Sequence, residues 1–408
     1  MSYEFYSYQL LLALTIILFT LYYIRLKVGL VSLPIVFNAY ALLYFVFGQN
    51  FYYSSILDGY ASWEFLEVVK LSVSSLFFFN LSFVIFYKCI TPRERIHGYI
   101  PSRDLIYFSV ALGLLAHVLL IALGGADFFS MGRVERFGVF KQYRIILLLS
   151  NLLILGMIFS FARYEITRDQ KDYKLAMGVL YIVLIYSILT ISRTNLTICV
   201  IVALFYFERT GIWSRSKIII VLLATAIGLF FFKGVLYDLI LGNDSYEKFN
   251  PGEFINWIRN SILILSSSYP EVYMPENSYL LTIKSLFNPS PAGQALSEWF
   301  IEYYYPERAM PGLTYGFSGV IEGYLYGGYL GSILHFSFIG ALFAFISRSK
   351  SLMGGIILVC CLTLLFRLFR SEMYNFVKTI TWYYLYQILL LFLIDKLVMH
   401  NRQRISKT

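Results

Sequence analysis

Stretches of about 20 mostly apolar residues recur along this chain, separated by short polar breaks, and each is long enough to cross a bilayer as a helix. The composition agrees, because 59% of the 408 residues are hydrophobic and only 14% are charged. A closed barrel would show alternation over about ten residues instead of long apolar runs such as LYIVLIYSILT at 180–190. We therefore predict an all-α, polytopic integral membrane protein.

Hydropathy predicts about 11 transmembrane helices. Of the 33 lysines and arginines, 19 fall in the polar breaks that would share one side of the membrane with the C-terminus. Since basic residues favour the cytoplasmic side, we expect the N-terminus outside and the C-terminus in the cytoplasm. The predicted spans lie near 7–24, 28–48, 65–88, 105–124, 144–162, 175–192, 195–208, 218–238, 326–347, 352–368 and 376–397.

One long connection divides the chain, and it holds seven of the ten prolines. The expected organisation is spans one to eight at 1–238, a large outer loop with amphipathic helices at 239–325, and spans nine to eleven with a basic tail at 326–408. Loops of this length usually carry function. Acidic residues outnumber basic ones in the loop, so it is not a surface for nucleic acid or other polyanions.

Two amphipathic helices are predicted within the loop. One, around Phe254, Trp257 and Ile258, suits the membrane interface. Carboxylates beside aromatic rings suit carbohydrate, because sugars present hydroxyl donors and flat C–H faces; the alternative is that the rings only anchor the loop to the membrane. On the second helix, Leu296, Trp299, Phe300 and Tyr303 follow the i, i+3, i+4, i+7 spacing of one face, and Glu298 and Glu302 fall on another. The candidate sugar-binding residues on this helix are Glu298, Trp299, Glu302 and Tyr303.

A series of glycines at intervals of three and four follows the loop: Gly312, Gly316, Gly319, Gly323, Gly327 and Gly331. We expect a smooth stripe along one helix face, where a neighbouring helix approaches closely; a groove for an isoprenoid tail is the alternative. Glu322 lies beside the stripe, with Tyr326 one turn later. Because a carboxylate near the membrane boundary needs a partner or a role, Glu322 is our first candidate catalytic residue and Tyr326 a candidate for binding substrate.

Arginines gather at the predicted outer ends of the spans. An arginine at mid-bilayer costs about 2.5–3.5 kcal/mol on insertion scales, so a retained one tends to face a cavity or an anion. The alternative is that each side chain reaches out to the lipid headgroups. The candidates for binding an anionic substrate are Arg133, Arg136, Arg193, Arg308, Arg367 and Arg370.

Familiar motifs of metal and nucleotide chemistry are absent from the sequence. It contains no Asp-x-Asp pair, Walker loop, Gly-x-Ser-x-Gly elbow or His-Glu-x-x-His. We therefore expect chemistry without a metal ion or cofactor. His117 and His335 lie within predicted spans, and we expect them to pack or to bridge polar groups rather than to catalyse.

This layout resembles the O-antigen polymerase (Wzy) family of bacterial inner membranes. The similarity lies in about eleven spans, one dominant late outer loop, the Ser192–Arg193 hairpin and the sequence GVIEGYLYGGYLG at 319–331. The resemblance implies a lipid-dependent, C-type glycosyltransferase that polymerises oligosaccharide repeat units at the periplasmic face. It implies undecaprenyl-diphosphate-linked oligosaccharide as donor and acceptor, with a chain-length regulator and a flippase as partners, and periplasmic arginines that match Arg193 best.

The residues also fit such a glycosyl transfer on chemical grounds. Arg193, Arg367 and Arg370 would stabilise the departing diphosphate. Glu322 is the first candidate to accept the proton of the acceptor hydroxyl, and Glu298 and Glu302 are the next candidates. Two alternatives stay open, an O-antigen ligase and a flippase or other transporter of lipid-linked oligosaccharide. Similar ligases carry an important histidine in the outer loop, which this chain lacks. Transporters usually show repeated halves, and we find no internal repeat.

Overall fold

The computed structural model describes residues 2–55, 62–91, 100–125, 128–129, 142–190, 192–225, 228, 252–267, 277–308, 318–349 and 351–405. Over these residues the chain is helical with no strand, which confirms the predicted all-α class. Eight helices in this part of the chain are long and apolar enough to cross a membrane, and each coincides with a predicted span. They are Tyr3–Arg25, Trp63–Cys89, Arg103–Gly124, Arg144–Thr167, Gln170–Leu189, Gly319–Ser347, Leu352–Arg370 and Met373–Val398.

Three predicted spans are not among these eight. The one near 28–48 forms α2 (Leu33–Ala41), a π-helical turn (Leu42–Phe47) and α3 (Gly48–Ser55) in direct succession. The one near 195–208 forms α10 (Arg193–Thr210). The end of the one near 218–238 lies outside the described residues, so the total of eleven stays a prediction.

The chain forms two compact units, each assembled from segments that are far apart in the sequence. Unit 1 consists of Met1–Arg93, Phe249–Ser349 and Leu364–Lys378. Unit 2 consists of Glu94–Lys248, Lys350–Thr363 and Thr379–Thr408. The helices of the long loop therefore fold together with the first helices of the chain.

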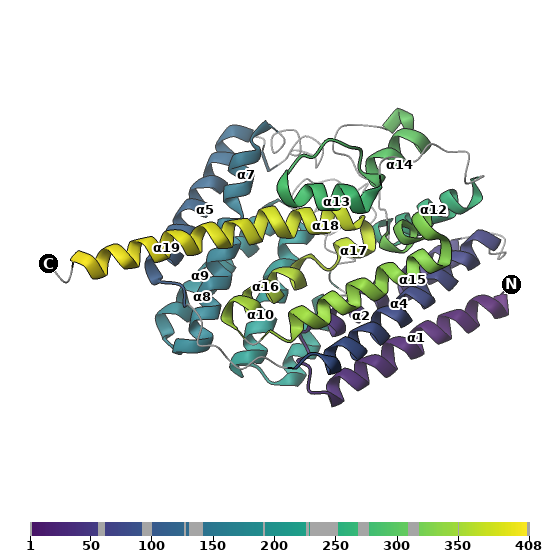
Figure 1. Cartoon of the computed structure of the whole chain (residues 1–408), viewed down its shortest axis with the longest axis horizontal. Helices are drawn as coiled ribbons and strands as arrows, with labels where there is room; N and C mark the ends of the chain where they lie inside the picture. Colours follow the sequence, from purple (N-terminus) through teal and green to yellow (C-terminus); the bar gives the residue numbers. More distant parts are fainter. Residues whose placement is uncertain are drawn as a thin grey trace. The chain divides into compact units, whose positions relative to one another are not determined.

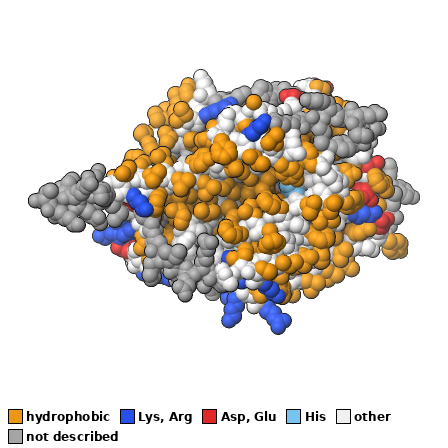
Figure 2. Space-filling view, in the orientation of Figure 1, with side chains coloured by type: hydrophobic (Ala, Val, Ile, Leu, Met, Phe, Trp, Pro, Cys, Tyr) orange, Lys and Arg blue, Asp and Glu red, His pale blue; other side chains and the backbone are white. Residues whose placement is uncertain are grey.

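Three long helices form the body of unit 1: α1 (Ser2–Arg25), α4 (Trp63–Cys89) and α15 (Gly319–Ser347). α4 packs against both of the others, and the three lie side by side in Figure 1. The Tyr23 hydroxyl of α1 donates a hydrogen bond to Asn80 Oδ1 of α4 at 2.8 Å. Large apolar side chains such as Leu10 and Leu18 remain exposed on α1, as on a helix that faces lipid, and Figure 2 shows hydrophobic side chains over much of the visible face.

The long loop contributes three helices to unit 1: α12 (Gly252–Ser266), α13 (Ser278–Phe287) and α14 (Leu296–Tyr304). α12 and α14 confirm the two predicted helices, whereas α13 was not expected. Phe254 and Trp257 of α12 pack on Tyr44 and Phe45, with ring centroids 4.8 and 5.3 Å apart. Protein therefore covers this apolar face, so its rings do not anchor the helix in lipid, and the predicted place of the helix at the membrane interface stays a prediction.

α15 is a helical hairpin rather than one straight helix. Gly327 (φ −167°, ψ 22°) and Gly328 (φ 59°, ψ −146°) leave the helical conformation in its interior. The positive φ of Gly328 is a conformation that side chains other than glycine rarely adopt. The chain folds back here, so that a short first arm, 319–326, packs against the start of a long second arm, 329–347.

The predicted glycine stripe therefore needs a correction. Gly323 and Gly331 meet across the hairpin, and a Cβ atom on Gly331 would lie 2.1 Å from the Gly323 carbonyl oxygen. Across the same contact the Ser332 hydroxyl donates to the Val320 carbonyl at 2.8 Å. The glycines do allow close helix packing, as expected, but between two arms of one element instead of along one face.

Gly331→Ala is expected to destabilise the protein, whereas Gly327→Ala serves as a matched control. The new methyl group at Gly331 meets a backbone oxygen that cannot rotate away, and overpacking of this kind costs typically about 1–3 kcal/mol. A Cβ atom on Gly327 would have no atom within 4 Å. Thermal unfolding of both variants in detergent measures the difference, and equal melting temperatures would contradict the hairpin packing.

Unit 2 contains α5 (Arg103–Gly124), α7 (Arg144–Ser150), α8 (Leu152–Thr167), α9 (Gln170–Leu189), α10, most of α16 (Leu352–Leu364) and α19 (Tyr386–Ile405). α8 packs against α5 and α9, and α9 packs against α10. Ser102 and Asp169 begin α5 and α9 by accepting hydrogen bonds from backbone N–H groups of the first turn. The same serine also binds Asp395 of α19.

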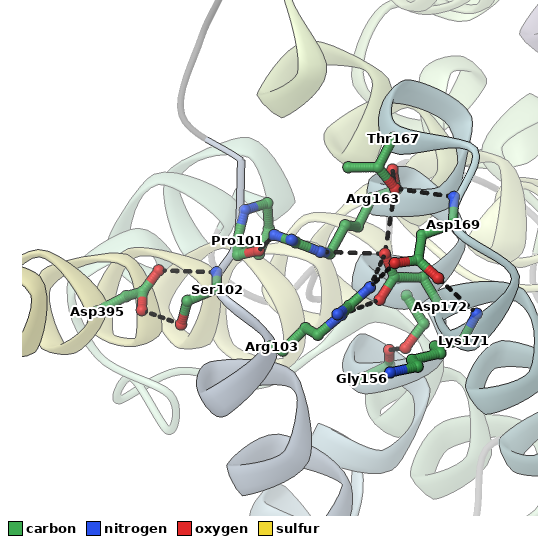
Figure 3. A network of polar contacts seen from close by, with 11 residues as sticks. Pro101, Ser102, Arg103, Gly156, Arg163, Thr167, Asp169, Lys171, Asp172 and Asp395 are labelled. Carbon is green, nitrogen blue, oxygen red and sulfur yellow. Dashed lines mark hydrogen bonds and ion pairs between the residues drawn. The ribbon is translucent and has the colours of Figure 1, made fainter.

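A network of charges joins the ends of α5, α8 and α9 (Figure 3). Asp172, whose side chain is 2% exposed, accepts from Arg103 Nε at 2.8 Å and from Arg163 Nε at 3.1 Å. Thr167 donates to the same carboxylate at 3.1 Å. Asp169 is more exposed and accepts from Arg103 alone among the arginines shown. The buried Asp172 is therefore the centre of the network.

Asp172→Asn is expected to lower the melting temperature by at least about 5 °C, because it leaves two arginines without the buried charge that they share. Asp169→Asn is the control, since asparagine keeps the helix cap and the lost ion pair is partly exposed to solvent. Thermal unfolding of both variants measures this. If Asp169→Asn proved the more harmful change, Asp172 would not be the centre of the network.

Candidate functional site

A cavity of about 640 Å³ lies in unit 1. Its walls come from α13, from both arms of α15 and from α18 (Met373–Thr379). Side chains such as Ile283, Leu334 and Phe338 make most of the lining apolar, and Gly323, Gly327 and Gly331 line it too. Polar groups enter it from Tyr279, Thr282, Tyr326 and His335. The hairpin therefore shapes an apolar cavity with a few polar groups at one region of its wall.

Glu322 lies in the first arm of α15 and is fully buried. One carboxylate oxygen accepts a hydrogen bond from the Ser278 hydroxyl at 2.5 Å, and the other accepts from the Met373 backbone N–H at 2.7 Å. Ser318 begins the same arm by accepting from the Val320 N–H. The carboxylate thus connects α13, α15 and α18, and both of its oxygens have the hydrogen-bond partners that a buried carboxylate requires.

His335, in the second arm, links Glu322 to the cavity. Its Nδ1 atom lies 2.7 Å from the Tyr279 hydroxyl, and its Nε2 atom lies 3.9 Å from Glu322 Oε2. His335 is 5% exposed, and both His335 and Tyr279 line the cavity, whereas Glu322 does not. His335 is therefore packed and contacts Tyr279 directly, while its Nε2 atom has no hydrogen-bond partner among the described residues. We call these three residues the Glu322–His335–Tyr279 series.

Two tyrosines, Tyr279 and Tyr326, line the polar region of the cavity. The Tyr326 hydroxyl accepts a hydrogen bond from the Ser278 N–H at 2.9 Å, and its ring lies 5.5 Å from that of Tyr279. Burial raises the pKa of Tyr279 above its ordinary value, and the nearby Glu322 carboxyl raises it further. Tyr279 therefore keeps its proton at neutral pH.

A second buried carboxylate, Glu372, lies in the break between α17 (Arg367–Arg370) and α18. Its Oε1 atom accepts from the Ser297 hydroxyl at 3.0 Å and from the Asn375 amide at 2.7 Å. Its Oε2 atom has no hydrogen-bond partner within the described residues. Because Ser297 belongs to α14, this carboxylate joins the long loop to the segment that also supplies the Met373 N–H.

The predicted arginines fall in different parts of the chain. Arg367 and Arg370 form the two ends of α17 in unit 1, and their guanidinium carbons lie 6.0 and 5.4 Å from the Phe366 ring centre. Arg193 belongs to unit 2 and is the first residue of α10, with 9% of its surface exposed. The hairpin predicted at this point is confirmed, since Ser192 caps α10 directly after α9 ends. A common location for all three arginines stays a prediction.

The residues predicted on α14 differ in accessibility. Trp299 is 5% exposed and packs in a hydrophobic cluster with Ile321 and Leu325, so its ring is not open for stacking on a sugar. Tyr303 is exposed and stacks on Trp299 with centroids 6.0 Å apart. Glu298 and Glu302 are exposed. Of the two aromatic residues, Tyr303 alone offers an open face.

Three predicted arginines remain unplaced. Arg308 ends a short 3-10 turn, Pro306–Arg308, and its side chain lies outside what the structure describes. Arg133 and Arg136 also lie outside the described residues. Their role in binding substrate stays a prediction.

Sequence reasoning identified Glu322 and Tyr326 but missed Ser278, Tyr279 and Glu372, and it did not treat His335 as part of a site. In a straight helix, His335 would lie about 20 Å from Glu322 along the axis. The fold at the two adjacent glycines removes that separation. The Gly327–Gly328 pair inside an apolar run was therefore the signal that such a contact was possible.

No protein-family model, curated protein or solved structure matches this chain. Its function must therefore be inferred from its own residues. A buried carboxylate, an imidazole and a phenol in series beside an apolar cavity form an arrangement that can accept a proton from a bound hydroxyl group.

Proposed function

We propose that this chain is a lipid-dependent glycosyltransferase of the C type in the bacterial inner membrane. It polymerises undecaprenyl-diphosphate-linked oligosaccharide repeat units into O-antigen or a related surface polysaccharide at the periplasmic face. The observation that carries the proposal is the buried Glu322 carboxylate, held by two hydrogen bonds behind the imidazole and phenol of the cavity wall. The cavity combines an apolar lining with a few polar groups, and the proposed substrate likewise combines an apolar isoprenoid chain with a polar group that reacts.

The reaction needs a proton acceptor and a stabiliser of negative charge. A hydroxyl group of the acceptor sugar attacks the anomeric carbon of the donor and gives up its proton. The bond from that carbon to the diphosphate oxygen breaks, and its electron pair leaves with the diphosphate. A positioned base contributes typically about 10²–10⁴-fold to such a step. We assign to Glu322 the charge on which this proton transfer depends.

Arginines supply the stabilising charge in this proposal. Arg367 and Arg370 directly precede the segment whose Met373 N–H binds Glu322, which supports placing the diphosphate on that side of the cavity. Arg193 occupies the N-terminal end of α10, where the helix dipole disfavours a cation but favours an anion. That position is explained if Arg193 binds an anionic substrate group.

The apolar part of the cavity suits the lipid. Its volume of about 640 Å³ is within the usual range for ligand pockets. Gly327, where a Cβ atom would meet nothing within 4 Å, leaves room beside Leu330 and Leu334, which supports the isoprenoid groove that the glycine series suggested. We propose that the first isoprene units of the donor or acceptor occupy it.

Reconstitution tests this function directly. The purified chain in lipid nanodiscs receives the source strain's repeat unit on undecaprenyl diphosphate, in buffer with EDTA. We expect a ladder of polymer and one undecaprenyl diphosphate released for each bond formed. Release that requires added lipid A–core, without a ladder, would favour the ligase. Neither product, with transfer of lipid-linked sugar across the bilayer, would favour the flippase.

A further inference from the structure

We propose that Tyr279 and His335 form a proton relay at the cavity wall, in which Tyr279 is the catalytic residue that touches the acceptor hydroxyl and Glu322 is a positioning residue behind His335. This inference rests on the proposed function and refines it. In this refinement the phenol of Tyr279, rather than the Glu322 carboxylate, contacts the substrate.

The positions of the three groups carry the proposal. Glu322 is fully buried, and each of its oxygens already accepts a hydrogen bond, from Ser278 or from Met373. Tyr279 and His335 line the cavity, and Tyr279 is the more exposed of the two. A hydroxyl group bound in the cavity therefore meets the phenol before it can reach the carboxylate.

The proposed relay runs in one direction. Nε2 of His335 lies 3.9 Å from Glu322 Oε2 and has no hydrogen-bond partner among the described residues. In the relay the neutral ring carries its hydrogen on this Nε2, on the side of the carboxylate. Nδ1 is then the acceptor for the Tyr279 hydroxyl at 2.7 Å. The carboxylate also stabilises the imidazolium that forms when Nδ1 takes a proton.

Each glycosyl transfer releases one proton from the acceptor hydroxyl and one electron pair to the diphosphate. The acceptor O–H gives its proton to the Tyr279 oxygen while the Tyr279 O–H proton moves to Nδ1 of His335. The acceptor oxygen bonds to the anomeric carbon, and the carbon–oxygen bond to the diphosphate breaks with its electrons. Tyr279 ends the step neutral, and His335 ends it as an imidazolium opposite Glu322 and passes the extra proton to water before the next turnover.

The test compares Tyr279→Phe, His335→Gln and the double variant in the reconstituted polymerisation assay, with Tyr329→Phe as control. Tyr329 lies in the second arm of α15, is exposed, is not among the residues that line the cavity, and has its ring 6.2 Å from that of Tyr324. We expect each single relay variant to lower kcat by about 10²-fold or more, with the donor KM within about twofold of wild type. The double variant should be no worse than either single one, because residues that act as a unit are not additive.

The outcomes separate this inference from the proposed function. If wild type polymerises and folded Tyr279→Phe keeps a normal kcat, the relay is wrong and the glycosyltransferase stands. A loss confined to KM, or additive losses in the double variant, also overturns the relay. If wild type forms no polymer and releases no undecaprenyl diphosphate, the proposed function fails and the relay fails with it. Tyr279→Phe removes one oxygen and keeps the ring, so it decides the matter even if His335→Gln does not fold.

Discussion

Glu322→Gln folds and reaches normal abundance in the membrane but loses polymerisation by about two orders of magnitude or more: this is the expected result of removing one charge and keeping the shape. The glutamine oxygen can still accept from the Met373 N–H, and its amide can donate to the Ser278 hydroxyl. It carries no negative charge opposite His335, however, so a protonated imidazole is no longer stabilised. Polymer length and amount at matched protein level measure the loss.

Glu67→Gln is the matched control for this change. Glu67 is also a largely buried carboxylate in a membrane-spanning helix of unit 1, but its partner is Lys70, 3.0 Å away on the next turn of α4. We expect this variant to make polymer normally. Polymer of wild-type length from Glu322→Gln would remove Glu322 from the mechanism.

Arg193→Ala is expected to make no polymer while the protein remains at normal abundance. The largely buried guanidinium group of Arg193 lies at the N-terminal end of α10. A cation there interacts unfavourably with the helix dipole, because cations are favourable at the C-terminal end. In the proposed function, loss of this guanidinium group removes a charge that stabilises the departing diphosphate. Arg193→Lys should restore activity only in part, because an ammonium group cannot form a bidentate contact with phosphate oxygens.

Arg209→Ala provides the control at the other end of the same helix. Arg209 is bound to Glu165 at 2.7 Å, and we expect its removal to leave chain length unchanged. Lipopolysaccharide gels of cells that express each variant, with membrane abundance checked by immunoblot, make the comparison. Normal chain lengths in Arg193→Ala would take Arg193 out of the site.

Local sequence rules predicted much of the fold because they depend on neighbouring residues. Apolar length placed all eight observed candidate spans, and helical spacing placed α12 and α14. The same spacing says nothing about what covers an apolar face. For that reason Trp257 and Trp299, which looked suited to the membrane or to sugar, proved to be packed inside unit 1.

The sequence predicted Glu322 but not its partners, because the contacts of the candidate site join residues that are far apart in the sequence. Glu322 was found because a lone carboxylate at that depth needs partners. Its partner Ser278 is 44 residues away, and Ser297 is 75 residues from Glu372. His335 joins Glu322 only through the backbone conformation of two glycines. None of these pairings leaves a periodic signal in the sequence.

The most direct measurement of the proposed polymerase function is the electrophoretic profile of surface lipopolysaccharide from the source strain, with the gene for this chain deleted and then restored. The proposed polymerase predicts that deletion leaves core carrying a single repeat unit and that restoration returns the full ladder. An unchanged ladder after deletion would contradict it, and bare core after deletion would point to the ligase or the flippase instead.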